Sequence, residues 1–179
     1  MGTLPLAGDS PATTSMPGPE RATPRGRGRP ARIRESGEPE GSFFLDTNIL
    51  VYTFDDSAPA KRERAKSLVQ SALTTRLGRI SSQVVQEFLN VALRRFAVPL
   101  RPADAEDYLR LVLAPLCRHS PDSDFYHRAL LLSATASLSW YDSLIVQAGL
   151  DLKCHVLYSE DLQHGQVFGE MRVENPFLS

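Results

Sequence analysis

The apolar positions between residues 41 and 179 recur with two different periods. A spacing of three and four residues, typical of one face of a helix, begins after Pro59 and ends at Gly78. Its apolar members are Ala65, Leu68, Val69, Ala72 and Leu73. The same spacing predicts further helices through residues 84–92, from 102 to about 114, from about 124 to 136, and from 139 to 150.

Short apolar runs between these helices predict strands at 42–46, 79–81, 116–119, 155–159 and 171–174. A parallel connection needs a helix to bring the chain back to the start of the next strand. The alternation of the two element types therefore predicts an α/β fold, with a central, mostly parallel sheet covered by helices on both faces.

The first 40 residues have a different composition from the rest of the chain. They hold 7 of the 13 prolines, 6 of the 11 glycines and no aromatic residue, which predicts a disordered leader before a folded domain at 41–179. The run from Arg25 to Pro30 alternates Arg with Gly and resembles an AT-hook, except that Gly26 occupies the place where that motif usually has a Pro before its first Arg. A solvated tail, or translated upstream sequence from a misassigned start codon, is the preferred interpretation.

The amino-acid composition excludes a few classes of function but does not identify one. The 179 residues carry 20 Lys plus Arg against 21 Asp plus Glu, and this net charge of −1 excludes nucleic-acid binding by bulk positive charge. Two cysteines in a chain of this length indicate free thiols in a reducing compartment. Neither a secretory signal nor a membrane-spanning apolar run is present, so we expect a cytoplasmic protein without a membrane partner.

Acidic residues follow the predicted strands or begin the helices after them. They are Asp46, Glu87, Asp142 and Asp161. Ligands of open α/β sheets bind at the carboxyl ends of the strands, so these four side chains are the candidates for a shared site.

Each acid also has an ordinary structural explanation. Asp46 is a typical helix N-cap, and Glu87 lies on the shoulder of its helix, where a solvated side chain is common. Asp142 follows Ser139 at capping-box spacing, and Asp161 suits the start of a helix. A shared functional site is therefore indicated only by the four acids taken together.

Four carboxylates in one crevice repel one another unless a cation neutralises them. A site made of oxygen ligands alone suits Mg²⁺ or Mn²⁺ better than Zn²⁺. Such ions generate hydroxide from water and stabilise the oxygens of a phosphodiester during an in-line displacement.

Four segments of the chain resemble the signature segments of PIN-domain ribonucleases, particularly VapC-type toxins. The segments are FLDTNILVY at 44–52, ISSQVVQEF at 80–88, SWYDSLI at 139–145 and YSEDLQHG at 158–165. The resemblance implies a PIN-like three-layer sandwich and a metal-dependent endoribonuclease, the toxin component of a type II toxin–antitoxin system. It also implies an RNA substrate, a homodimer and a cognate antitoxin that holds the toxin inactive.

The resemblance also assigns roles to individual residues. Asp46, Glu87, Asp142 and Asp161 match the acidic residues that bind Mg²⁺ or Mn²⁺ and carry catalysis. Asn48 and Ser159 match the polar residues that orient those acids. The Arg-rich leader is not part of the family's compact domain, and it is either an RNA-binding tail or without a role.

Several alternatives remain open from the sequence. The foremost is a catalytically silent PIN-like module that binds RNA or protein without turnover. A haloacid dehalogenase-type phosphatase needs a second Asp where Asn48 stands. A zinc site lacks the usual cysteine spacing around Cys117 and Cys154. Basic residues at 61–66 and 94–95 suit RNA phosphates, yet solvated helix faces have the same composition.

Overall fold

The apolar run Phe43, Phe44 and Leu45 forms the strand β1 (Phe43–Leu45), and all three side chains are buried. In the computed structural model, which describes residues 41–178, β1 lies near the middle of a six-stranded sheet with the order β3-β2-β1-β4-β6-β5. The pairs from β3 through to β6 are parallel, and only β5 is antiparallel to its neighbour. Burial on both faces is typical of parallel strands, and it explains the continuous apolar run.

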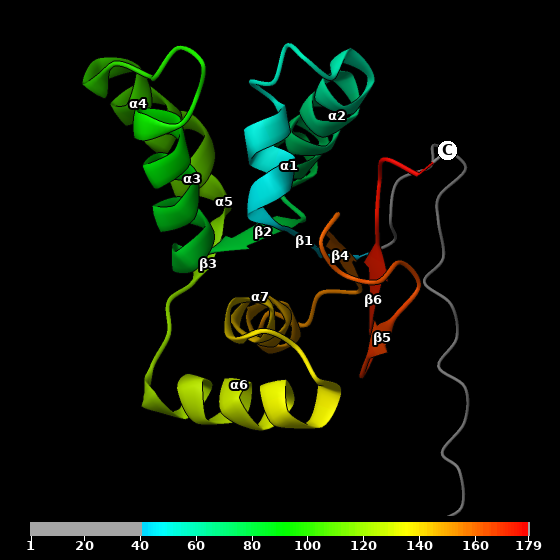
Figure 1. Cartoon of the computed structure of the whole chain (residues 1–179). Helices are drawn as coiled ribbons and strands as arrows, with labels where there is room; N and C mark the ends of the chain where they lie inside the picture. The colour runs from blue at the N-terminus through cyan, green and yellow to red at the C-terminus, as the bar shows by residue number, and fades with distance from the viewer. Residues whose placement is uncertain (1–40, 179) are drawn as a thin grey trace, which may run out of the picture.

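Helices cover both faces of the sheet (Figure 1). The helices from α1 to α5 lie on one side, while α6 packs on α7 on the other side, where α7 contacts β2. This arrangement confirms the predicted α/β fold with a mostly parallel sheet between two helical layers. The strands are β2 (Gly78–Ser81), β3 (Cys117–His119), β4 (Val156–Tyr158), β5 (Val167–Phe168) and β6 (Met171–Glu174).

The long helices match the apolar spacing of the sequence within a few residues. They are α2 (Pro59–Thr75), α3 (Ser82–Arg94), α6 (Ser123–Ala136) and α7 (Trp140–Asp151). Helix α2 ends three residues before the predicted Gly78, because Arg76 adopts a left-handed conformation with φ 57° and closes the helix. Gly78 instead begins β2, where its lack of a side chain lets the strand approach Ala72 of α2.

Two predicted boundaries and two omissions differ from the structure. The helix predicted at 102–114 continues as α4 (Pro102–Tyr108), a π-helical turn η1 (Leu109–Leu113) and α5 (Ala114–Leu116), so Leu116 is helical and β3 begins one residue later. The short helix α1 (Thr47–Tyr52) and the two-residue strand β5 have no counterpart among the predictions. Neither is long enough to produce a period in the sequence.

Predictions for residues 1–40 lie outside the described part of the chain. Within residues 41–178, no single helix is long and apolar enough to cross a membrane, although α6 and α7, bent by 116°, pass the same length and composition test as a pair. Cys117 is half-buried, Cys154 is buried, and both are free.

Candidate functional site

Asp46 is the buried centre of the candidate site. It follows β1 directly and is the N-cap of α1, where the backbone N–H of Thr47 donates a 2.6 Å hydrogen bond to its Oδ1. The hydroxyl of Ser159, which follows β4, donates a 2.7 Å hydrogen bond to Oδ2. Because β1 and β4 are parallel neighbours, the two strand ends bring these side chains together across 113 residues of sequence.

Burial raises the pKa of Asp46 from 3.8 to about 6, since the ionised carboxylate loses its hydration there. The hydrogen bonds from Ser159 and Thr47 oppose this effect by stabilising the charged form. The negative charges of Asp161 and Glu87 raise the pKa further. Asp46 therefore lies in the electrostatic field of two of the other predicted acids.

Asn48 and Asp161 complete this part of the site. The side-chain amide of Asn48 donates a 3.1 Å hydrogen bond to Asp161 Oδ2 and a longer 3.5 Å one to Asp46 Oδ2. The backbone N–H of Asp161 donates to the Ser159 hydroxyl at 3.2 Å. Asp161 lies in an irregular segment after β4, so the explanation of this acid as a helix-start residue is wrong.

Glu87 reaches the site from the second turn of α3. The hydroxyl of Thr47 donates a 2.7 Å hydrogen bond to its Oε2, and the side-chain amide of Gln83 donates a 2.8 Å hydrogen bond to its Oε1. Thr47 and Gln83 are positioning residues that were not predicted from the sequence. Gln83 lies four residues before Glu87 on the same helix, and that spacing is a signal for a side-chain pair.

Asp142 differs from the other three acids because its hydrogen bonds are with Ser139, three residues earlier in the chain. It is half-buried in the first turn of α7, where its N–H donates to the Ser139 hydroxyl at 3.1 Å. The same hydroxyl donates to Asp142 Oδ2 at 2.7 Å, so the predicted capping interaction is present. Among residues 41–178, no hydrogen bond joins Asp142 to Asp46, Glu87 or Asp161.

A cleft of about 540 Å³ opens over part of this network. Glu87, Asp161, Thr47 and Asn48 line it, and Arg95 is the cation in its lining. A second hollow of about 730 Å³ shares Val51, Asp55, Val91 and Arg95 with the cleft. The two together form a groove, which we call the acid groove, that runs from the acids towards the start of α2 and the end of α3.

The atoms around Asp46 that could coordinate a metal suit a hard divalent cation, because all of them are carboxylate, amide or hydroxyl oxygens. The Oδ1 atom of Asn48 is a buried acceptor that has no hydrogen-bond partner, and such an atom is a suitable ligand. Within the described residues, no group of three or more His, Cys, Asp or Glu side chains is placed so as to hold a metal ion together. The residues therefore fit a cation that is held by the amide oxygen of Asn48 together with carboxylate oxygens of Asp46 and Asp161, rather than by a cluster of three acids.

Lys61, one of the basic residues noted in the sequence, forms an ion pair next to the candidate site. Its ammonium group donates to Glu160 at 2.5 Å and to the Tyr52 hydroxyl at 3.1 Å. Glu160 precedes Asp161, so this ion pair joins α2 to the segment that carries an acid of the site.

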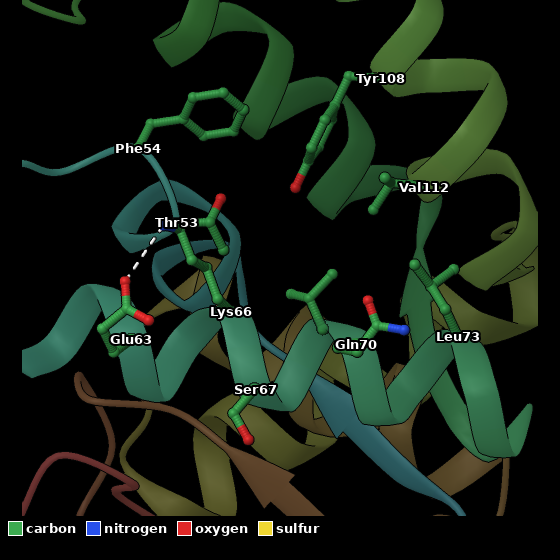
Figure 2. A pocket seen from close by; sticks show the side chains of 10 residues that line it. Thr53, Phe54, Glu63, Lys66, Ser67, Gln70, Leu73, Tyr108 and Val112 are labelled. Atoms are coloured by element: carbon green, nitrogen blue, oxygen red, sulfur yellow. Dashed lines mark hydrogen bonds and ion pairs between the residues drawn. The ribbon is translucent and has the colours of Figure 1, made fainter.

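A further hollow of about 580 Å³ lies between α2 and the α4–η1 helix, away from the acids (Figure 2). Phe54 and Tyr108 lie at one end of it, and Leu73 and Val112 lie further along. The ion pair of Glu63 with Lys66, 3.2 Å long, stands at its edge. We call this hollow the α2–α4 pocket.

Comparisons with known proteins concern the family and the fold of the chain. The family model described as PIN domain matches residues 43–167. None of the curated proteins compared with the chain matches it significantly.

Similar solved structures include a toxin–antitoxin complex from Klebsiella pneumoniae, with 19% identity, a TM-score of 0.56, and coverage of 76% of this chain and 98% of that chain. VapC20 of Mycobacterium tuberculosis, described as a toxin that cleaves the sarcin–ricin loop, has 21% identity and a TM-score of 0.53, with 73% and 99% covered. DNA-bound VapBC from Salmonella typhimurium has 20% identity and a TM-score of 0.53, with 75% and 98% covered. At these identities the likeness concerns the fold.

Proposed function

Because the chain belongs to the PIN domain family, we propose that it is a metal-dependent endoribonuclease, which hydrolyses RNA phosphodiester bonds as the toxin component of a type II toxin–antitoxin system. The observation that supports this most directly is the network around Asp46, which links two strand ends and α3 through Thr47, Asn48 and Ser159. The description of the similar VapC20 as an RNA-cleaving toxin is consistent with the proposal.

In this proposal Asp46, Glu87, Asp142 and Asp161 hold Mg²⁺ or Mn²⁺. The ion supplies a hydroxide nucleophile and stabilises the charge that develops on the phosphate. Ser159 and the N–H of Thr47 fix both oxygens of Asp46, while Asn48 holds the carboxylate of Asp161. These donors keep the acids oriented before the substrate arrives, which lowers the cost of reorganisation during the reaction.

The proposal also explains why so buried an acid as Asp46 lies near Glu87 and Asp161. Burial, together with the negative charges of Asp161 and Glu87, raises its pKa, and a bound cation would favour the ionised carboxylate again. Proton release from Asp46 is therefore expected to accompany metal binding near pH 6.

The direct test is cleavage of single-stranded and structured RNA by the purified chain with Mg²⁺, with Mn²⁺ and with EDTA. We expect cleavage that depends on the metal and is lost in Asp46→Asn. The control is Asp124→Asn, which removes an exposed acid from the first turn of α6. Equal cleavage in EDTA, or by the Asp46 variant, would contradict the proposal.

One observation favours the alternative of a silent binding module. Asp142 is bonded to Ser139, and the described residues do not place three acids in metal-binding geometry. A silent module binds RNA with the same affinity in Mn²⁺ and releases no product. The cleavage assay above therefore separates the two functions.

We expect a small antitoxin as partner, because an uninhibited ribonuclease harms the cell that makes it. Two surfaces suit such a protein: the α2–α4 pocket, whose lining includes apolar side chains, and the acid groove. A cytoplasmic location and a homodimer are part of the same proposal. Light scattering measures the dimer, and stable, harmless expression of the active chain alone at high level would argue against the antitoxin.

A further inference from the structure

A small cavity of about 140 Å³ lies between the first turn of α3 and the first turns of α6 and α7. It is separate from the acid groove and holds none of the four predicted acids. Aromatic and polar side chains face it together. They include Ser82, Gln83, Gln86, Phe125, Tyr126 and Tyr141.

Two of its rings are more exposed than large aromatic side chains usually are. Tyr126 is 42% exposed and Tyr141 is 65% exposed. Tyr126 is held in place because it stacks on Trp140, with ring centroids 6.3 Å apart and planes 29° apart, and meets Phe125 edge-on. A rigid ring that is open to solvent is a suitable stacking surface for a planar ligand.

The polar side chains connect the cavity to the candidate site. Gln83 lines the cavity and donates its amide hydrogen bond to Glu87. Gln86 lies three residues after Gln83 on α3. It is exposed and makes no hydrogen bond with the described residues. Its amide presents both a donor and an acceptor, which is the combination that the edge of a nucleobase requires.

The volume sets the size of the ligand. An apolar protein cavity of roughly 150 Å³ holds one benzene molecule. At about 140 Å³, the cavity between α3, α6 and α7 thus has room for a single six-membered ring. A pyrimidine fits within this space, whereas the second ring of a purine would extend beyond it on the side that is open to solvent.

We infer that this cavity binds one unpaired pyrimidine base of the RNA strand, next to the phosphate that the acids engage. The inference rests on the proposed nuclease function and names the feature of the substrate that the enzyme recognises. The base stacks on Tyr126 or Tyr141, and Gln86 hydrogen-bonds to its edge. Selection of a pyrimidine at one position then determines where the strand is cleaved.

Exposed aromatic side chains are also common in protein interfaces. Two observations favour a base over a protein surface. The cavity takes one ring rather than a run of side chains, and Gln83 joins it to the hydrogen-bond network of Glu87. An interface between two copies of the chain would give a different result in the binding experiments.

The first experiment measures binding of short, end-labelled RNA strands to the full chain by fluorescence anisotropy. The strands are oligouridine, oligocytidine, oligoadenosine and a strand of the same length with abasic riboses. Ca²⁺ replaces the catalytic ion in this assay and neutralises the acids through oxygen ligands. Loss of one stacked base weakens binding by about 5- to 150-fold, so we expect the abasic strand to bind more weakly than the pyrimidine strands by that factor, and oligoadenosine to be intermediate.

The second experiment repeats the titrations with Tyr126→Leu, Tyr141→Leu and Gln86→Leu. Each variant is expected to reduce the preference for pyrimidine over abasic RNA and to leave binding of the abasic strand unchanged. Leu131→Ala is the matched control, because Leu131 is an exposed apolar residue of α6 that does not line the cavity. Melting temperatures confirm that every variant is folded.

Equal affinity for pyrimidine and abasic strands would overturn the inference. So would variants that weaken both strands equally and convert a dimer to a monomer in light scattering, since this surface would then be an interface between copies. Cleavage of the same strands with Mn²⁺ is measured separately. A pyrimidine preference without cleavage would support the cavity and contradict the nuclease, and cleavage without any preference would do the reverse.

Discussion

The hydroxyl of Thr47 donates a 2.7 Å hydrogen bond to Oε2 of Glu87, although 40 residues separate the two in sequence. This contact joins the start of α1 to α3, and Gln83 holds the second carboxylate oxygen of Glu87. Neutral donors therefore fix both oxygens of this acid. Thr47 also donates its backbone N–H to Asp46, so one residue positions two acids of the proposed site.

Thr47→Val tests this relationship, because valine keeps the shape of threonine and removes the hydroxyl. The half-buried carboxylate of Glu87 loses one donor, and groups that orient metal ligands are typically worth about 10- to 100-fold in metal affinity or activity. We expect the Mn²⁺ concentration for half-maximal RNA cleavage to rise within that range. Thr47→Ser keeps the hydroxyl and is expected to behave as the wild type. Unchanged metal dependence in the valine variant would show that the contact has no role in the site.

The raised pKa of Asp46 predicts how the stability of the metal-free protein depends on pH. The pKa is about 6 in the fold against 3.8 for the free side chain, so the fold favours the protonated carboxyl. The resulting stabilisation is complete below pH 3.8 and is lost as the pH rises through about 6. Asp46→Asn removes this ionisation, and we expect it to be more stable than the wild type above pH 6, by up to about 3 kcal/mol.

Urea unfolding in EDTA, at several pH values between about 4 and about 8, measures this difference. The difference in unfolding free energy between variant and wild type should grow with pH across that range. Saturating Mn²⁺ should reduce it, because the cation stabilises only the protein that has the carboxylate. A difference that does not vary with pH would mean that Asp46 ionises in the fold as it does in water.

The sequence predicted the layers of the fold because they depend on long patterns. Helix α2 is long enough for the spacing of Leu68, Val69 and Ala72 to show a helical period. The buried strand at 43–45 is visible as a continuous apolar run. Helix α1 has only six residues, and its start depends on the cap made by Asp46, so periodicity did not detect it. The sequence also indicated the candidate acids and, beside them, Asn48 and Ser159. It did not indicate Thr47, since the Thr47–Glu87 contact depends on how α1 and α3 pack.

Two glycines that contact neighbouring elements are predicted to differ in how well they tolerate substitution by alanine. A Cβ on Gly78 would lie 2.2 Å from the Cβ and 2.7 Å from the Cα of Ala72, so strand β2 and helix α2 must move apart. A Cβ on Gly149 would lie 2.6 Å from Sδ of Met171, near the flexible end of that side chain, and at an ordinary contact distance of 3.7 Å from Cβ of Phe44. Alanine also favours the helix at that position. We expect Gly78→Ala to cost about 1–3 kcal/mol of stability in urea unfolding, and Gly149→Ala to cost less. The reverse order would contradict this account of the packing.

Residues 1–40 are predicted to be dispensable for folding, because they are rich in Pro and Gly and contain no aromatic residue. A chain that begins at Gly41 should have the same melting temperature as the full chain. The same pair of proteins tests the Arg-rich run, since an RNA-binding tail would make RNA affinity fall on truncation. A large drop in melting temperature would show that the leader contributes to the fold.

Asp142 has both a structural and a proposed catalytic role, and Asp142→Asn separates the two. Asparagine keeps an oxygen that accepts the hydrogen bond from Ser139, so capping is retained and the stability should change by about 1 kcal/mol or less. The substitution removes one negative charge, so RNA cleavage should collapse if Asp142 is a metal ligand. Ser139→Ala is the converse variant, because it breaks the cap at a cost of about 0.5–2 kcal/mol but keeps the charge, and it should retain more cleavage than Asp142→Asn. Cleavage near the wild-type rate by folded Asp142→Asn would leave this acid as the capping-box partner of Ser139 and exclude it from the proposed site.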